Sequence, residues 1–355
     1  MKILMVARRF PPDVQSGTET VFANLYRRAC QNHEVRLVAG YSRERSFIPE
    51  EALGVDLRGW GRGGRHLRLW QVTRWAIRRF KPDVVLSNSI EAPAVAHSAF
   101  IVHDLNFGRA RPRLSTRMRE LLYRWRRFQL PWVIAPSEAT RQGLLDLGYD
   151  PTRVEVIHNG VDLAAFQPRE RTGGETVRLC YPGRILPGKG QHLAVDAIAR
   201  LRPEEKGLVH LDIAGAVTDR VYFNQLRVAA HGQPISFHPD VDDIVPFYQR
   251  ADLVLFPTLM REGFGYTAVE AMACGRPVVF SDQPGIREAT GGIGVPVQPR
   301  DPLALQAAIR QYLADPKPFD ELGRKGRAFV ESHYDWERVW DHYEERLMKL
   351  ALNRH

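Results

Sequence analysis

The chain has few cysteines and no long apolar segment. Its 355 residues include three cysteines, odd in number and far apart: Cys30, Cys180 and Cys274. They match neither a disulfide framework nor a metal-binding pattern, which indicates a reducing compartment. The apolar stretch after Met1 ends at Arg8 and is too short for a signal peptide, so we interpret it as a first strand. No stretch approaches the roughly 18 apolar residues of a membrane span, so we expect a soluble, cytoplasmic protein.

Lysine is also scarce, because only 7 of the 50 basic residues are lysines. The formal net charge of +9 is unevenly distributed along the chain. Residues 1–168 carry 26 Lys and Arg against 16 Asp and Glu, whereas residues 169–355 carry 24 against 25. The first half therefore holds the whole basic excess. This asymmetry indicates an anionic partner for that half, such as phospholipid, a phosphorylated glycan or nucleic acid.

Short apolar runs alternate with helical patterns along the chain, which is typical of α/β proteins with parallel sheets. We expect two doubly wound, Rossmann-like domains, residues 1–168 and 169–335, with a linker near Phe166–Thr176. We expect the helical pattern in residues 336–355 to pack back on the first domain. The predicted strands are Ile3–Ala7, Val35–Ala39, Val84–Leu86, Phe100–Val102, Val133–Ala135 and Val154–Ile157, then Val177–Tyr181, Val209–Ala214, Ile235–Phe237, Leu253–Phe256, Val278–Phe280 and Val295–Val297.

A cationic glycine loop follows the first strand of the second domain. Gly183 through Lys189 match the first seven places of a P-loop, but Gly190 stands where Ser or Thr would hold magnesium. This excludes a P-loop nucleoside triphosphatase. Arg184 and Lys189 remain in a loop that leads into a helix N-terminus, which suits a diphosphate group. The alternative is a solvated basic turn.

Two glutamates eight residues apart follow a later apolar strand, Asp252–Pro257. Glu262 lies in a glycine turn at the carboxyl end of this strand, and Glu270 lies in the next helix. Open parallel sheets bind ligands at those strand ends. Carboxylates there can accept hydrogen bonds from sugar hydroxyls. The alternative is a surface carboxylate followed by an ordinary helix glutamate.

The first domain offers weaker signals. Gly17, at the start of a predicted helix, would let backbone amides approach a phosphate or sugar. His103 follows a predicted strand and is a candidate polar contact or proton shuttle, although a lone histidine is more often structural. In the second domain, Asp240 and Asp242 form a DxD triplet that could hold a metal ion. Asp242 or Asp243 could instead cap the next helix.

Basic residues gather in two segments that also contain aromatic residues, Arg58–Lys81 and Arg109–Arg127. Their helical patterns combine arginine faces with aromatic or leucine faces, which suits contact with anionic lipid. The alternative is two solvated helix faces whose aromatic side chains belong to the core. The candidate membrane or acceptor patch consists of Arg117, Arg124, Trp125, Arg126 and Arg127.

Together these motifs resemble the retaining glycosyltransferases of family 4. That family has the GT-B fold, in which two Rossmann-like domains face a central cleft. The resemblance covers nearly the whole chain and is strongest from Tyr181 to Pro299. In the N-terminal loop, Ser16 stands where a first glycine is usual. The segments that carry the resemblance are Gly183-Arg184, Lys189-Gly190, Ile213–Gly215, Glu262–Gly265, Glu270-Ala271 and Gly275–Val278, together with Ile157–Asp162.

The resemblance implies a role for each candidate residue. Arg184 and Lys189 would bind the donor diphosphate, Glu270 the ribose hydroxyls, and Glu262 the transferred sugar, while His103 would line the sugar site. Arg184, Lys189, Glu262 and His103 are thus the expected catalytic residues. The expected donor-binding residues are Gly17, Gly183, Gly263, Phe264, Gly265, Tyr266, Thr267 and Glu270.

The expected activity is therefore retaining transfer of a hexose from a UDP- or GDP-linked donor to a glycan or lipid-linked acceptor. Cell-envelope polysaccharide, lipopolysaccharide or glycolipid synthesis would be its setting, at the inner face of the cytoplasmic membrane. We expect no cofactor and no metal requirement, and no nucleic-acid partner. Two alternatives remain: a sugar-nucleotide epimerase with two Rossmann domains, and a non-catalytic nucleic-acid-binding protein.

Overall fold

The computed structural model describes residues 1–11, 17–41, 49–59, 62–90, 92–103, 105, 114–170, 174 and 176–352. The chain divides into two compact units. Unit 1 comprises Met1–Gly160 with Trp336–His355, and unit 2 comprises Val161–Asp335. The division falls between Gly160 and Val161, earlier than the predicted boundary after residue 168.

Unit 1 contains a seven-stranded parallel sheet. Its order is β3 (Leu53–Asp56), β2 (Glu34–Tyr41), β1 (Lys2–Ala7), β4 (Val84–Ser87), β5 (Ser98–Ile101), β6 (Trp132–Ala135) and β7 (Val154–Val156). Most of these strands are continuous apolar runs because both faces of the sheet are covered. Edge strand β3 was not predicted, since it has four residues, one of them glycine.

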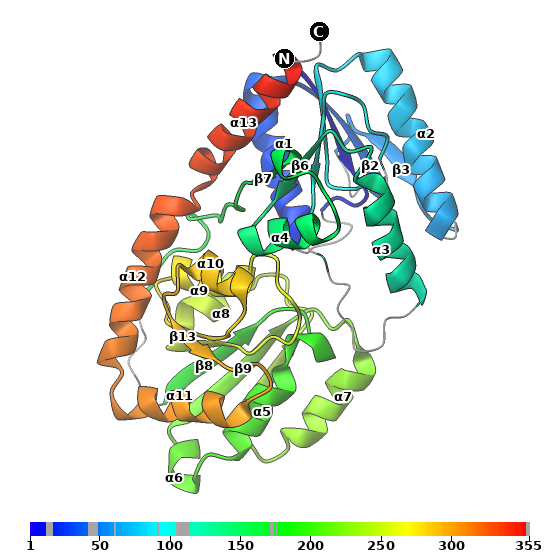
Figure 1. The fold of residues 1–355 in the computed structure, drawn as a ribbon. Coiled ribbons are helices and arrows are strands. Elements are labelled where there is room, and N and C mark those ends of the chain that lie inside the picture. The colour runs from blue at the N-terminus through cyan, green and yellow to red at the C-terminus, as the bar shows by residue number, and fades with distance from the viewer. Residues whose placement is uncertain are drawn as a thin grey trace. The chain divides into compact units, whose positions relative to one another are not determined.

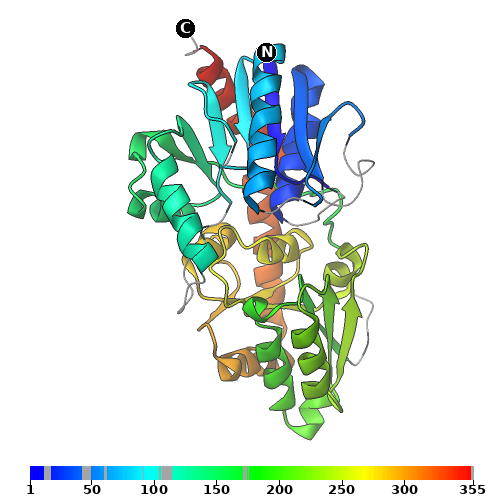
Figure 2. The same cartoon turned by 90° about the vertical axis from the view of Figure 1, so that its right-hand side faces the viewer.

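Helices cover both faces of this sheet. On one face lie α2 (Arg62–Phe80), α3 (Leu114–Arg126) and α4 (Glu138–Asp146), whose Leu69, Tyr123 and Leu144 share one core cluster with the strands. Figure 2 shows α2 in front of the strands. The helices α1 (Gly17–Asn32) and α13 (Trp336–Leu352) pack together in the same unit (Figure 1), where Arg28 pairs with Glu337 at 3.0 Å.

Unit 2 contains a six-stranded parallel sheet in the order β10 (Ile235–Pro239), β9 (Val209–Gly215), β8 (Val177–Pro182), β11 (Leu253–Phe256), β12 (Val278–Ser281) and β13 (Val295–Val297). The prediction of two doubly wound parallel sheets is confirmed. The helices of this unit are α5 (Gln191–Ala199), α6 (Pro203–Lys206), α7 (Arg220–Ala229), α8 (Val245–Arg250), α9 (Tyr266–Ala273), α10 (Pro284–Thr290), α11 (Pro302–Ala314) and α12 (Lys317–His333).

The strand order reverses once in each sheet. In unit 2 the chain builds β8, β9 and β10 outward and then returns to place β11 on the other side of β8. In unit 1 the same reversal separates β1 from β4. Loops that leave neighbouring strands in opposite directions open a crevice at the carboxyl ends, where doubly wound sheets bind ligands. A ligand site is therefore expected at the loops after β8 and β11.

Among the described residues, no helix is both long and apolar enough to cross a membrane.

Candidate functional site

The loop after β8 passes close to the end of β11 because Gly190 has no side chain at the point of contact. Gly190 has φ +80°, and a Cβ atom there would lie 2.2 Å from the carbonyl oxygen of Pro257. The loop is also held by side chains from its flanks. The Tyr181 hydroxyl donates to the carbonyl of Lys189, and the side-chain amide of Gln191 donates to the carbonyl of Arg184 at 2.9 Å. These bonds hold the loop between Gly183 and Gly190 in one conformation.

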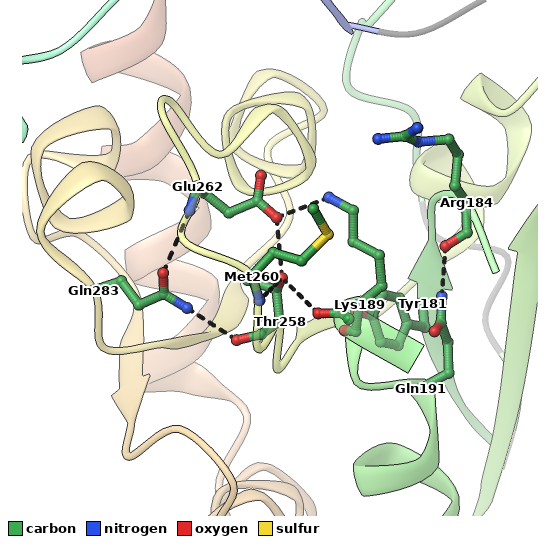
Figure 3. A network of polar contacts seen from close by, with 9 residues as sticks. Tyr181, Arg184, Lys189, Gln191, Thr258, Met260, Glu262 and Gln283 are labelled. Atoms are coloured by element: carbon green, nitrogen blue, oxygen red, sulfur yellow. Dashed lines mark hydrogen bonds and ion pairs between the residues drawn. The ribbon is translucent and has the colours of Figure 1, made fainter. Parts of the chain in front are cut away.

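Lys189 and Glu262 form an ion pair across the β8–β11 reversal (Figure 3). Lys189 Nζ lies 2.8 Å from Glu262 Oε1, and the two side chains are only 12% and 16% exposed. The Thr258 hydroxyl donates to the same carboxylate oxygen at 2.9 Å. A pair so shielded from water differs from an ordinary surface salt bridge, because removing one partner leaves a poorly solvated charge.

The loop that carries Glu262 is held by a residue from the next strand end. Gln283 Nε2 donates to the Thr258 carbonyl at 3.0 Å, and Gln283 Oε1 accepts from the Glu262 amide at 3.4 Å. A Cβ atom at Gly285 would lie 2.3 Å from the Glu262 carbonyl, so glycine is required there. Our sequence reasoning missed Thr258 and Gln283. Both could have been found from the sequence, because each is a polar residue shortly after a predicted buried strand: Thr258 two positions after Phe256, and Gln283 three positions after Phe280.

Helix α9 begins beside the glycine loop. Gly265, at φ +83°, precedes its first residue, Tyr266. A Cβ atom at Gly183 would lie 3.8 Å from Thr267 Oγ1, so the first turn of α9 lies against the end of β8. Helix N-termini favour anions through their amides and dipole. Gly263 is partly exposed, whereas the Phe264 ring is 3% exposed and packs in the core, so Phe264 can contact a ligand through its backbone only.

Glu270 lies in the second turn of α9 and is partly buried. The Tyr248 hydroxyl donates to Glu270 Oε2 at 2.5 Å. Burial raises the pKa of Glu270 from its ordinary 4.5 to about 7, and the Tyr248 hydrogen bond and the Lys189 charge oppose that rise. The carboxyl group therefore titrates close to neutral pH.

We predict that Glu270→Gln stabilises the protein at alkaline pH. Because the folded-state pKa of about 7 exceeds the ordinary 4.5, the folded protein binds an extra proton between these values. Stability from this group is complete below pH 4.5 and is lost as the pH rises through 7. The loss amounts to up to about 3 kcal/mol in the free energy of unfolding. Denaturation measured across that range should show this slope in the wild type and in the exposed control Glu204→Gln, but not in Glu270→Gln. Equal slopes in all three would contradict the assignment.

Arg184 does not join the Lys189–Glu262 pair. Its side chain is exposed and rises from the loop on the same side as that of Lys189 (Figure 3). The loop thus presents one shielded cation and one exposed cation toward the space above the strand ends.

Two predicted site residues lie in unit 1. Gly17 is the first residue of α1, after the carboxyl end of β1, whereas Ser16 lies outside the described residues. His103 follows the end of β5 by two residues and is partly buried. Both lie at the carboxyl edge of the unit 1 sheet. Gly17 follows β1, which borders the strand reversal, and His103 follows β5, which pairs with β4 on the other side of the reversal.

The predicted basic patch is only partly on the surface. Arg117, Arg124 and Trp125 are exposed, and Arg127 is partly buried. Arg126 is 6% exposed, and its guanidinium donates to the Ala92 carbonyl at 2.6 Å and to Gln129 at 2.7 Å. The prediction that Arg126 lies on the exposed face is therefore wrong, because this side chain points inward and is bound by protein oxygens. Residues 109–113 of the same basic segment lie outside the described residues.

Asp240 of the DxD triplet and Asp243, which follows the triplet, each bind a backbone amide. Asp240 Oδ1 accepts from the Val217 amide at 2.8 Å, and Asp243 Oδ1 accepts from the Val245 amide, the first residue of α8, at 2.9 Å. Within the described part of the chain, no group of three His, Cys, Asp or Glu side chains is arranged to hold a metal ion.

Comparison with known proteins decides the family. Residues 176–315 match the model for glycosyl transferases group 1, and residues 15–165 match the model for glycosyltransferase family 4. Glycogen synthase from Mycobacterium tuberculosis is 30% identical over 315 residues, which cover 85% of this chain and 72% of that protein. The chain belongs to glycosyltransferase family 4. This glycosyltransferase is also 34% identical over 230 residues to the D-inositol 3-phosphate glycosyltransferase of Geodermatophilus obscurus.

The latter match covers 59% of this chain and 50% of that relative, so the chain spans about half of its length. Among solved structures, Anabaena HepE in complex with UDP and glucose superimposes with a TM-score of 0.79. The sequences are 20% identical, and the match covers 98% of this chain and 100% of that one. The likeness shows that this glycosyltransferase has the GT-B fold.

Proposed function

We propose that this glycosyltransferase transfers a hexose from a nucleoside diphosphate sugar to a glycan or lipid-linked acceptor, with retention of configuration at the anomeric carbon. The observation that carries the proposal is the shielded Lys189–Glu262 pair at the reversal between β8 and β11. It places a fixed cation and a hydroxyl-binding carboxylate within one hydrogen bond of each other. A nucleoside diphosphate sugar can use both, because its diphosphate pairs with a cation and its sugar hydroxyls donate hydrogen bonds to a carboxylate.

In unit 2, different residues would bind the leaving group and the sugar. Departure of the nucleoside diphosphate builds negative charge, which Lys189, Arg184 and the first turn of α9 would stabilise. Glu262 would accept hydrogen bonds from the hydroxyls of the transferred sugar, and Glu270 from the ribose. His103, from unit 1, would contact the sugar. The departing phosphate would accept the proton of the acceptor hydroxyl as the new glycosidic bond forms on the same face.

The relatives support a nucleotide-linked hexose donor and a hydroxyl acceptor. The HepE structure is a complex with UDP and glucose, and the two relatives are named glycogen synthase and D-inositol 3-phosphate glycosyltransferase. We therefore propose a UDP- or GDP-linked hexose as donor. For the acceptor we propose a cell-envelope polysaccharide or glycolipid precursor.

The test is a panel of UDP-, GDP- and ADP-linked hexoses, each with and without glycan or lipid-linked acceptors. We expect release of a nucleoside diphosphate that depends on the acceptor, and an axial or equatorial product bond that matches the donor, as read by proton NMR. Conversion of the donor sugar without nucleoside diphosphate release would instead establish an epimerase. An inverted product bond would refute the retaining step.

We further propose that the enzyme needs no metal ion, because Lys189 and Arg184 can neutralise the diphosphate while Asp240 of the DxD triplet binds a backbone amide. Activity should then be unchanged when EDTA is added to enzyme purified without divalent ions. Loss of activity with EDTA, reversed by magnesium or manganese, would reassign Asp240 and Asp242 as metal ligands.

A further inference from the structure

A cavity of about 470 Å³ opens between α2 and α3 in unit 1. The ends of these helices lead into β4 and β6, and the loop at residues 92–95 leads into β5. All three segments lie at the amino ends of parallel strands, so the cavity is at the sheet edge opposite Gly17 and His103. Its lining residues are Trp70, Arg74, Ile77, Arg78, Pro93, Ala94, Val95, Arg126 and Gln129.

The cavity is suited to an anion with an apolar neighbour. Among the described residues that line it there are three arginines and no carboxylate. Arg126 is buried, and the Ala92 and Gln129 oxygens fix its guanidinium. Arg74 and Arg78 are exposed, and the Arg74 guanidinium lies 4.7 Å over the Trp70 ring. Guanidinium groups in such a cluster bind phosphate oxygens by paired, charge-assisted hydrogen bonds.

The helix beside the cavity carries an exposed apolar stripe. Met118, Leu121, Trp125 and Phe128 are 62%, 65%, 56% and 73% exposed, and spacings of three and four residues put them on one face of α3 and its extension. Arg124 is exposed beside them. Across the cavity, Leu67 and Trp75 of α2 are 55% and 56% exposed. An apolar face with basic neighbours is characteristic of helices that lie in an anionic membrane interface.

We propose that the α2–α3 cavity binds the phosphate headgroup of an anionic membrane lipid while the apolar stripe of α3 enters the lipid interface. Charge complementarity selects this occupant, since the cavity is cationic and its rim is apolar. The inference deepens the proposed function, because it would hold the enzyme at the membrane that carries a lipid-linked acceptor. Lipid binding and sugar transfer are measured in separate assays, so a negative result for the lipid site does not refute the proposed sugar transfer, and the reverse also holds.

Vesicle flotation with matched variants tests the proposal. The wild type should bind vesicles that contain phosphatidylglycerol and ignore pure phosphatidylcholine vesicles. Arg74→Ser with Arg78→Ser should lower the partition coefficient by about tenfold or more. The control Arg68→Ser with Arg79→Ser removes the same charge from exposed positions of α2 outside the cavity and should have less than a third of that effect. Equal losses in the two pairs would overturn the headgroup site.

A second pair tests the apolar stripe. Leu121→Ser with Trp125→Ser should weaken binding to the same vesicles by about tenfold, without change in thermal stability, because both side chains are exposed. The control Val221→Ser with Val228→Ser removes exposed apolar side chains from α7 in unit 2 and should leave binding unchanged. Unchanged binding in the α3 pair, or wild-type binding to phosphatidylcholine alone, would overturn the proposal.

Discussion

Replacing Lys189 with alanine should lower kcat by about 10² or more, because it removes a preorganised cation from the position where the leaving diphosphate gains charge. The affinity for the free nucleoside diphosphate should fall as well, since the product carries that charge. The protein should remain folded. Its unfolding free energy should decrease by about 1–3 kcal/mol, because Glu262 keeps the Thr258 hydrogen bond but loses its cation.

Lys325→Ala is the matched control for this prediction. Lys325 is also in unit 2, its side chain is 61% exposed, and its nearest carboxylate, Glu321, is 3.6 Å away. We expect wild-type turnover from this variant. Turnover of Lys189→Ala near that of Lys325→Ala, in protein shown to be folded, would remove Lys189 from the site.

Replacing Glu262 with glutamine should lower turnover and strengthen product binding. Turnover should fall by about 10², because an amide is a poorer acceptor than a carboxylate for the sugar hydroxyls as charge develops at the anomeric centre. In the donor-free enzyme, however, Glu262 competes with the diphosphate for Lys189. Removing the carboxylate charge should therefore tighten nucleoside diphosphate binding by about threefold to tenfold.

The two substitutions should change the affinity for nucleoside diphosphate in opposite directions, which distinguishes the role of Lys189 from that of Glu262. Calorimetric titration should show weaker nucleoside diphosphate binding in Lys189→Ala and tighter binding in Glu262→Gln, although both variants turn over slowly. Glu204→Gln, at a side chain 64% exposed in the same unit, should match the wild type in both assays. Weaker binding in Glu262→Gln would show that the carboxylate does not compete for Lys189.

Most of the fold could be predicted because both sheets are parallel and covered on both faces. Such strands appear as continuous apolar runs, and twelve of them were predicted near their observed positions. The missed strand β3 contains Gly54 and ends at Asp56, so its four residues carry too little apolar character to be distinguished from a loop. Its position depends on the pairing with β2.

The site was less predictable, because its contacts depend on tertiary structure. The residues of the Lys189–Glu262 pair are far apart in sequence, and only the strand reversal that places β11 beside β8 brings them together. The sequence placed each residue correctly at a strand end but could not show that they share a hydrogen bond. The prediction that Arg126 is exposed was wrong for a similar reason. An arginine in a basic helical segment indicates a solvated face unless a carbonyl such as that of Ala92 lies within its reach.

Titration of nucleoside diphosphates into the wild type, Lys189→Ala and Lys325→Ala tests the central claim most directly. We predict that UDP or GDP binds the wild type and Lys325→Ala equally and binds Lys189→Ala at least about tenfold more weakly. Equal affinity in all three proteins, or no binding of UDP, GDP or ADP to the wild type, would contradict a donor site at the β8–β11 reversal.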